Sequence, residues 1–235
     1  WFARGVDADA GLLGFRIVSE SLGSTSWYLR MLRDSPAAAE RLSQLLSSSR
    51  LMTDLLEDAS ASIAWLDKVD DLKALGEEAL ESEISSLLAR HEDAVEAMRA
   101  VRYLRRRETL RTAMGWTLGI VDIEDTCAGL AAIDECTIDA ALRIALRELQ
   151  STAEESEAGE TAGEQLLTRI AIIGMGRLGG AENGFGSDAD VMFVHEPLEG
   201  VDEDAAQEQA ARIVNRTLAL LKQPVKPPIR AERPL

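Results

Sequence analysis

Two aspartates, Asp188 and Asp190, have the residue type and the spacing that suit metal-assisted catalysis. They are two positions apart at the start of a predicted strand, and side chains alternate across a strand with a period of two. We therefore expect both carboxylates to project from the same face. Two like charges this close are costly unless cations lie between them, and Mg²⁺ is a hard cation that prefers oxygen ligands. The pair thus predicts a magnesium site.

The glycine-rich segment ahead of this pair suits phosphate binding. Gly179 and Gly180, followed by Gly186 and Ser187, offer backbone that can approach a triphosphate closely and direct N–H groups toward it. A glycine pair or Gly-Ser followed by Asp-x-Asp on a strand is typical of polymerase-β-like nucleotidyltransferases. Two metal ions there activate the attacking hydroxyl and stabilise the departing pyrophosphate during in-line displacement at the α-phosphorus.

A dinucleotide-binding fold is a competing interpretation of this segment. Gly174, Gly176 and Gly179 have G-x-G-x-x-G spacing after a predicted strand, and Glu196 follows roughly 20 residues on, where a ribose-binding acid belongs. That fold needs a helix of about ten residues or more between its strands. The interval 180–190 is rich in helix-breaking residues, which argues against it.

A purely structural interpretation also competes, in which Asp188 and Asp190 only cap turns in a glycine-rich loop. Asx turns are common, and Asp-x-Asp alone is a weak signal. The consecutive order of strand, double glycine, Gly-Ser and second strand favours nucleotidyl transfer.

The elements that position this segment divide into two parts. Residues 1–150 carry apolar side chains at helical spacing and predict a helical domain. We expect Gly23 to end the first helix, and Ser35 and Pro36 to begin another as its N-cap and first residue. A long helical stretch is expected from about 84 to 118.

Residues 151–163 are rich in glutamate and lack large apolar side chains, which predicts an acidic linker or loop. Residues 164–235 contain two predicted buried strands, 170–173 and 191–194, and a helix from about 204 to 222. The expected fold class is α+β: a mainly α-helical N-terminal part, then the first part of a polymerase-β-like nucleotidyltransferase α/β domain.

The composition excludes several classes of protein. Of the 235 residues 46% are hydrophobic and 28% charged, which fits a globular chain. With 41 acidic and 25 basic side chains the net charge is -16, so no nucleic-acid partner is expected. No apolar run approaches the roughly 20 residues of a membrane helix. The two cysteines form neither a disulfide framework nor a metal cluster, so we expect a cytoplasmic protein without membrane association.

One motif carries a resemblance to a known family: Gly174-Met-Gly-Arg-Leu-Gly-Gly-Ala-Glu-Asn-Gly-Phe-Gly-Ser-Asp-Ala-Asp-Val-Met-Phe-Val194. It resembles the nucleotidyltransferase motif of bacterial glutamine-synthetase adenylyltransferases, and stretches 22–30, 46–50 and 107–111 are similar as well. The resemblance implies transfer of AMP from ATP, with Mg²⁺, to a tyrosine of glutamine synthetase. It also implies a PII-type signalling protein and glutamine as regulators.

Family members carry two such domains, of which one removes AMP from glutamine synthetase by phosphorolysis and the other transfers it. The sequence Gly186-Ser187-Asp188 resembles the C-terminal, transferring copy. By the resemblance, Asp188 and Asp190 bind magnesium, and the four residues Gly179, Gly180, Gly186 and Ser187 contact the nucleotide.

Several features depart from the family pattern. Ala181 stands where a basic residue is frequent, and Asn183 where the residue is usually apolar. The third carboxylate that these enzymes need is expected beyond a proline-rich segment such as 224–234, hence after Leu235. Because the chain also begins with Trp1 rather than Met, we expect a piece of a longer protein that by itself transfers no AMP.

Three other functions stay open at this point. They are the deadenylylating domain of the same family, another nucleotidyltransferase such as a uridylyltransferase or an antibiotic-modifying enzyme, and a non-catalytic helical regulatory module.

The remaining polar candidates are expected to be structural. A cluster of five arginines predicts a solvated helix face that pairs with acids such as Glu108, with docking of the linker or a partner as the alternative. His195 is expected to be structural or exposed, and Cys127 and Cys136 to be small buried hydrophobes. The five arginines are Arg102, Arg105, Arg106, Arg107 and Arg111.

Overall fold

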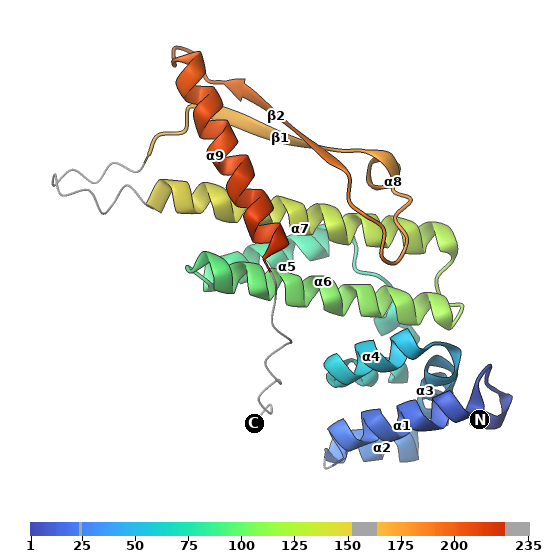
Figure 1. Cartoon of the computed structure of the whole chain (residues 1–235). Coiled ribbons are helices and arrows are strands. Elements are labelled where there is room, and N and C mark those ends of the chain that lie inside the picture. The colour runs from blue at the N-terminus through green and yellow to red at the C-terminus, as the bar shows by residue number, and fades with distance from the viewer. Residues whose placement is uncertain (24, 152–163, 224–235) are drawn as a thin grey trace. The chain divides into compact units, whose positions relative to one another are not determined.

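The computed structural model describes residues 1–23, 25–151 and 164–223 (Figure 1). The described chain forms two compact units, each of which has its own core. Of the described residues, the first unit contains those within 1–75 and 106–130, and the second contains 76–105, 131–151 and 164–223. The expected linker, 151–163, and the proline-rich segment, 224–234, lie almost entirely outside the described residues, and the division into a helical and a nucleotidyltransferase domain stays a prediction.

The first unit is helical, and two of its helices begin at residues whose side chains cap them. Asp7 accepts a hydrogen bond from the amide of Ala10 (2.9 Å), and Ser35 accepts one from the amide of Ala38 (3.4 Å). The predicted end at Gly23 and the predicted start at Ser35 and Pro36 are confirmed. Its elements are η1 (Phe2–Arg4), α1 (Ala8–Leu22), α2 (Ser26–Asp34), α3 (Pro36–Ser48), α4 (Arg50–Asp58), η2 (Ser60–Asp67), η3 (Val69–Leu72) and parts of α6 (Ala94–Thr117) and α7 (Ile123–Ser151).

The core of the first unit gathers apolar side chains from α1, α3, η2 and the second half of α6. Val18, Leu45, Ile63 and Met114 have no exposed surface. Three aromatic side chains take part as well, since Tyr28 is buried in this core and Trp27 and Trp65 pack against it. Burial of these side chains supplies most of the free energy that stabilises such a unit.

The long helix expected from about 84 to 118 is wrong, because two helices occupy this stretch. They are α5 (Glu77–Arg90) and α6 (Ala94–Thr117). His91 has extended backbone angles that end α5, and the carboxylate of Asp93 accepts a hydrogen bond from the amide of Glu96 (2.8 Å). An Asp directly before a helix is a preferred N-cap, and this local signal separates two helices whose apolar stripes run on.

The second unit combines helices with a small sheet. Helices α5, the first part of α6 and most of α7 (Ile123–Ser151) belong to it, together with β1 (Thr168–Gly174), α8 (Gly176–Gly179), β2 (Val191–Pro197) and α9 (Glu203–Lys222). Helix α9 packs against both strands, and α8 lies at the opposite end of the hairpin from the start of α9 (Figure 1). The predicted helix near 204–222 is confirmed, with Asp202 as its N-cap. The mainly helical α+β fold class is confirmed.

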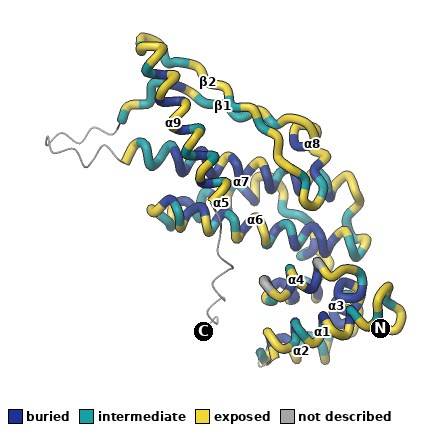
Figure 2. Tube along the Cα trace, in the orientation of Figure 1, coloured by how far each residue is buried: buried dark blue, intermediate teal, exposed yellow. Residues whose placement is uncertain are grey.

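The strands β1 and β2 are antiparallel, with register Gly174↔Val191 and Thr168↔Pro197. The dinucleotide-binding interpretation is therefore wrong for this segment, because that fold needs parallel strands joined by a long helix. Both strands were expected to be buried, and this is wrong as well. Within the two expected segments, 170–173 and 191–194, exposed residues alternate with partly buried ones such as Ile172 and Phe193. Both strands are therefore partly exposed (Figure 2). Among the described residues, no helix has the length and hydrophobicity to cross a bilayer.

Candidate functional site

The loop from Gly174 to Asp190 connects β1 to β2 and carries every predicted site residue. After Met175 the chain makes the single helical turn α8, and Gly180 and Ala181 follow it in a turn. A second tight turn spans Gly184–Ser187, in which the amide of Ser187 donates to the carbonyl of Gly184 (3.1 Å). The stretch ahead of the two aspartates is thus mostly irregular backbone, as the phosphate-binding interpretation requires.

Asp188 and Asp190 lie in the irregular segment directly before β2, not on the strand as the sequence suggested. The ladder is nevertheless prolonged to Asp190, because its carbonyl accepts a hydrogen bond from the amide of Met175 (2.8 Å). Both side chains are exposed. The Asp190 carboxylate also faces α8, since a Cβ atom built on Gly176 lies 3.3 Å from Asp190 Oδ2. That the two carboxylates share one face stays a prediction.

The structure gives Gly179 a packing reason that the sequence alone does not reveal. A Cβ atom at this position lies 2.3 Å from the carbonyl oxygen of Gly174 and 2.9 Å from its carbonyl carbon. Only glycine lets α8 return this close to the end of β1. Gly186 is also required by the backbone, because its φ is +79°. Both glycines shape the loop, whatever contact they make with a nucleotide.

Replacing Gly179 by alanine is expected to destabilise the second unit by about 1–3 kcal/mol, because the new methyl group overlaps the backbone of Gly174. Thermal denaturation of the two alanine variants of the glycine pair measures this effect. Gly180→Ala is the matched control, since its Cβ meets no described atom closer than 3.5 Å. Equal melting temperatures of the two variants would refute the close-approach interpretation.

Arg177, which contacts the predicted site residue Ser187, extends the candidate site beyond the residues that the sequence singled out. The hydroxyl of Ser187 accepts a hydrogen bond from the amide of Gly184 (2.9 Å), which closes the second turn. Arg177 Nη1 donates a long hydrogen bond to the same hydroxyl (3.4 Å). Arg177 is the only basic residue between 170 and 194. Its place between two glycines of the motif is the signal that sequence reasoning missed.

The donor set suits a hard divalent cation but is incomplete. Among the described residues, Asp188 and Asp190 form no ion pair and accept no side-chain hydrogen bond, so their oxygens are available as ligands. The described part of the chain holds no group of three or more His, Cys, Asp or Glu side chains that could bind a metal. Two carboxylates fit Mg²⁺, which is commonly held by one or two carboxylates together with phosphates and water.

The arginine cluster is only partly a solvated face, because Arg105 and Arg106 are exposed but three of the five arginines also bind other segments. Arg105 binds Asp134 on α7, and Arg107 and Arg111 bind Glu108, whose side chain is only 1% exposed. Arg102 donates hydrogen bonds to the carbonyls of Leu220 (2.9 Å), Leu221 and Gln223. These carbonyls end α9, where a cation satisfies acceptors that lack a partner within the helix. The pairing with Glu108 is confirmed.

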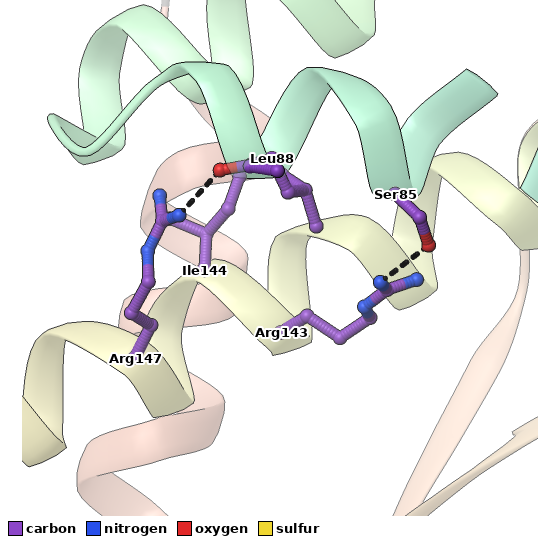
Figure 3. Close-up of a pocket in the computed structure, with 6 residues that line it drawn as sticks. Ser85, Leu88, Arg143, Ile144 and Arg147 are labelled. Carbon is purple, nitrogen blue, oxygen red and sulfur yellow. Dashed lines mark hydrogen bonds between the residues drawn. The ribbon is translucent and has the colours of Figure 1, made fainter. Parts of the chain in front are cut away.

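A pocket of about 310 Å³ lies between α5 and α7 and contains none of the predicted site residues (Figure 3). Two arginines line it, Arg143 and Arg147, and both bind α5. Arg143 donates to Glu81 and to Ser85, and Arg147 donates to the carbonyls of Leu88 (2.7 Å) and His91 (2.8 Å) at the end of that helix. Their positions are explained by joining the two helices.

The remaining nucleophiles and bases show no catalytic arrangement among the described residues. His195 is exposed, and its Nδ1 lies 3.2 Å from the hydroxyl of Thr168, in accord with the structural expectation. Burial and nearby carboxylates raise the pKa of the Cys136 thiol to about 11, which keeps it protonated and unreactive. Cys136 is buried as expected, whereas Cys127 is only partly buried.

Comparison with known proteins identifies one family whose members are similar to most of this chain. The family model described as glutamate-ammonia ligase adenylyltransferase matches residues 39–229. Similar curated proteins carry the name bifunctional glutamine synthetase adenylyltransferase/adenylyl-removing enzyme. The one from Leifsonia xyli subsp. xyli is 46% identical over 214 residues, which is 91% of this chain and 20% of the relative. Those from Streptomyces coelicolor and Mycobacterium tuberculosis are 42% and 38% identical, and each alignment covers 97% of this chain and 23% or 22% of the relative. The chain therefore spans about a fifth of the length of these relatives.

Proposed function

The chain belongs to the glutamate-ammonia ligase adenylyltransferase family, and from this premise we propose that its loop 174–190 forms the nucleotide-binding half of an adenylyltransferase site. The proposed reaction moves AMP from ATP to a tyrosine of glutamine synthetase. The observation that carries the proposal is the geometry of the loop: an irregular glycine-rich backbone that leads directly into two exposed carboxylates without a described cation partner.

In the proposed mechanism the residues of the loop bind and orient the triphosphate. The backbone N–H groups around Gly179, Gly180 and Gly186 contact phosphate oxygens, and the Ser187 hydroxyl holds the second turn in shape. Asp188 and Asp190 hold the metal that accompanies ATP. When bound, Mg²⁺ supplies positive charge to the phosphates during in-line displacement at the α-phosphorus. The tyrosine oxygen forms a bond to that phosphorus while the bond to pyrophosphate breaks and the tyrosine proton is lost.

We assign Arg177 to the phosphates of ATP, since it is the cation of the loop and contacts Ser187. Arg177→Ala is therefore expected to raise KM for ATP about tenfold or more, because a hydrogen bond to a charged group contributes about 1.5–3 kcal/mol. Steady-state kinetics at varied ATP concentration measure this change. Arg169→Ala is the matched control, since Arg169 lies on β1 and faces Glu196 at 3.9 Å. An unchanged KM in Arg177→Ala would remove the residue from the site.

The partners follow from the same proposal. Glutamine synthetase is the protein substrate, and a PII-type signalling protein and glutamine are proposed regulators. We place the activity in the cytoplasm, where ATP is available and where the two free cysteines stay reduced.

Isotope transfer tests the proposed reaction directly. The full-length protein is incubated with glutamine synthetase, Mg²⁺ and ATP labelled either at the α- or at the γ-phosphorus. Label from the α-position is expected on glutamine synthetase, and label from the γ-position is expected in pyrophosphate. Transfer of γ-label to the protein indicates a kinase instead, and no transfer of either label contradicts the proposal.

Removal of AMP is the second candidate, because the similar relatives are named for both reactions. The Gly186-Ser187-Asp188 sequence favours transfer for this copy of the motif. Phosphate-dependent release of AMP-derived label from adenylylated glutamine synthetase is the measurement that separates the two. Loss of release, with transfer retained, in an Asp188→Asn variant would assign this chain to removal.

A further inference from the structure

The glycine-rich loop is held by two buried side chains of different chemistry. Leu178 is 2% exposed and packs with Ala131 and Ile138 of α7. Asn183 has no exposed surface, and its Nδ2 donates a hydrogen bond to Asp134 Oδ2 (2.9 Å), which also belongs to α7. The first contact fixes α8, and the second fixes the chain between the two turns.

Asp134 is held from its other side by α6. Its Oδ1 accepts a hydrogen bond from Arg105 Nε (2.8 Å) and lies 2.7 Å from Arg105 Nη2 in an ion pair, and the Asp134 side chain is 11% exposed. A buried carboxylate is costly unless it is paired, and here the guanidinium of Arg105 supplies the charge and Asn183 satisfies the second oxygen. The three residues therefore form one connected chain of hydrogen bonds, Arg105–Asp134–Asn183.

This chain of hydrogen bonds ends next to the residues of the proposed site. Asn183 follows Ala181, whose φ is +55°, and precedes the turn Gly184–Ser187 that leads directly to Asp188. A left-handed backbone angle in a residue other than glycine persists only where surrounding contacts hold it. The buried Asn183 amide provides such a contact.

We propose that Asp134 is a positioning residue that fixes the second turn of the loop through Asn183, and thereby sets how well the loop binds ATP. The proposal rests on the proposed function for its effect on ATP but not for its effect on the loop. Without the Asn183–Asp134 hydrogen bond, which we call the anchor, residues 184–190 can adopt other conformations, in which Ser187 and Asp188 are no longer positioned to contact the triphosphate. The consequence is weaker nucleotide binding at a distance from the reacting atoms.

The Asn183 Oδ1 atom makes the test specific, because it is buried and has no hydrogen-bond partner among the described residues. In Asp134→Asn the new amide can donate to this oxygen after the Asn183 amide rotates, so the anchor survives. In Asp134→Leu the number and branching of the side-chain heavy atoms are kept, but no polar partner remains. If Asp134 serves only to fill space, Asp134→Leu is expected to leave the loop unchanged. If Asp134 anchors the loop by a hydrogen bond, Asp134→Asn is expected to leave it unchanged and Asp134→Leu is not.

Two measurements on the full-length protein test the proposal. Amide hydrogen exchange reports on the conformation of the loop, and steady-state kinetics report on ATP binding. We expect Asp134→Leu and Asp134→Ala to accelerate amide exchange in peptides that cover 184–190 and to raise KM for ATP about tenfold. Asp134→Asn is expected to stay close to wild type in both measurements. The matched control is Asp139→Asn, which alters a carboxylate on the same helix that lies 3.6 Å from Arg143.

The outcomes separate this proposal from the proposed function. Exchange that is unchanged in Asp134→Leu overturns the positioning role. Accelerated exchange without any adenylyl transfer by wild type supports the anchor and contradicts the proposed function. If the Asp134 variants do not fold, Asn183→Ala removes the anchor from the loop side, and unchanged exchange of 184–190 in that variant overturns the proposal equally.

Discussion

Adenylyl transfer is expected to fall at least about a hundredfold when Asp188 or Asp190 is replaced by asparagine in the full-length protein. Both carboxylates are exposed and pair with no described cation, so their removal leaves no buried charge unpaired and the fold is retained. The variants are expected to lose reaction rate rather than stability, because a bound metal lowers the activation free energy by several kcal/mol. Each 1.36 kcal/mol of that barrier corresponds to a tenfold change in rate. The rate of AMP incorporation into glutamine synthetase is the measurement.

A matched control uses an acid of the same loop. Glu182 is exposed and lies between the two turns, so Glu182→Gln removes one negative charge without touching the predicted metal ligands. We expect this variant to keep most of the activity and all three variants to melt at the wild-type temperature. Substantial transfer by either aspartate variant, with AMP release from adenylylated glutamine synthetase also retained, would show that the pair is not the metal site.

The largest expected loss of stability follows from Glu108→Ala in the first unit. The Glu108 side chain is 1% exposed and accepts from Arg107 Nε (2.7 Å) and Arg111 Nε (2.8 Å). Arg111 in turn donates to the carbonyl of Asp71 and lies over the ring of Trp65, 4.0 Å from its centroid. Breaking a buried ion pair from one side costs about 3–5 kcal/mol, because the partner charges stay behind.

Urea denaturation followed by tryptophan fluorescence measures this effect, since Trp65 reports on the cluster. Glu96→Ala is the control on the same helix, because the Glu96–Arg99 pair is nearly half exposed on both sides and contributes at most about 1 kcal/mol. Similar denaturation midpoints for the two variants would mean that the buried cluster does not stabilise the unit.

Local patterns predicted the elements well where the deciding contacts are close in sequence. The N-cap at Ser35, the start of α9 at Asp202 and the strand at Val191 each depend on neighbours within a few residues. The break before α6 also has a local signal, because Asp93 is an N-cap. The apolar stripe continues across this break, however, and so predicts a single long helix.

Local sequence patterns do not predict contacts between residues that are far apart in the sequence. Asn183 is a departure from the family pattern in the sequence, and only the fold brings it to Asp134, 49 residues away. Arg102 reaches α9 across more than a hundred residues. The sequence therefore predicts a solvated face for the arginine cluster, although Arg102, Arg105 and Arg111 each bind a carbonyl or an acid of another segment.

The candidate site was located by the glycine spacing and the aspartate pair, but its placement was only partly correct. Asp188 and Asp190 precede β2, because the residue pairing of the two strands stops at Gly174 and Val191 and only the Asp190 carbonyl continues the ladder. Whether two residues ahead of a strand share a face depends on backbone angles that a period of two does not determine.

Anomalous diffraction from crystals of the full-length protein with Mn²⁺ and a non-hydrolysable ATP analogue tests the metal site most directly. The expected result is manganese within about 2.3 Å of carboxylate oxygens of both Asp188 and Asp190, with the triphosphate against Gly179, Gly180 and Ser187. Manganese bound elsewhere, or the two carboxylates directed to opposite sides of the chain, would contradict nucleotidyl transfer by this loop.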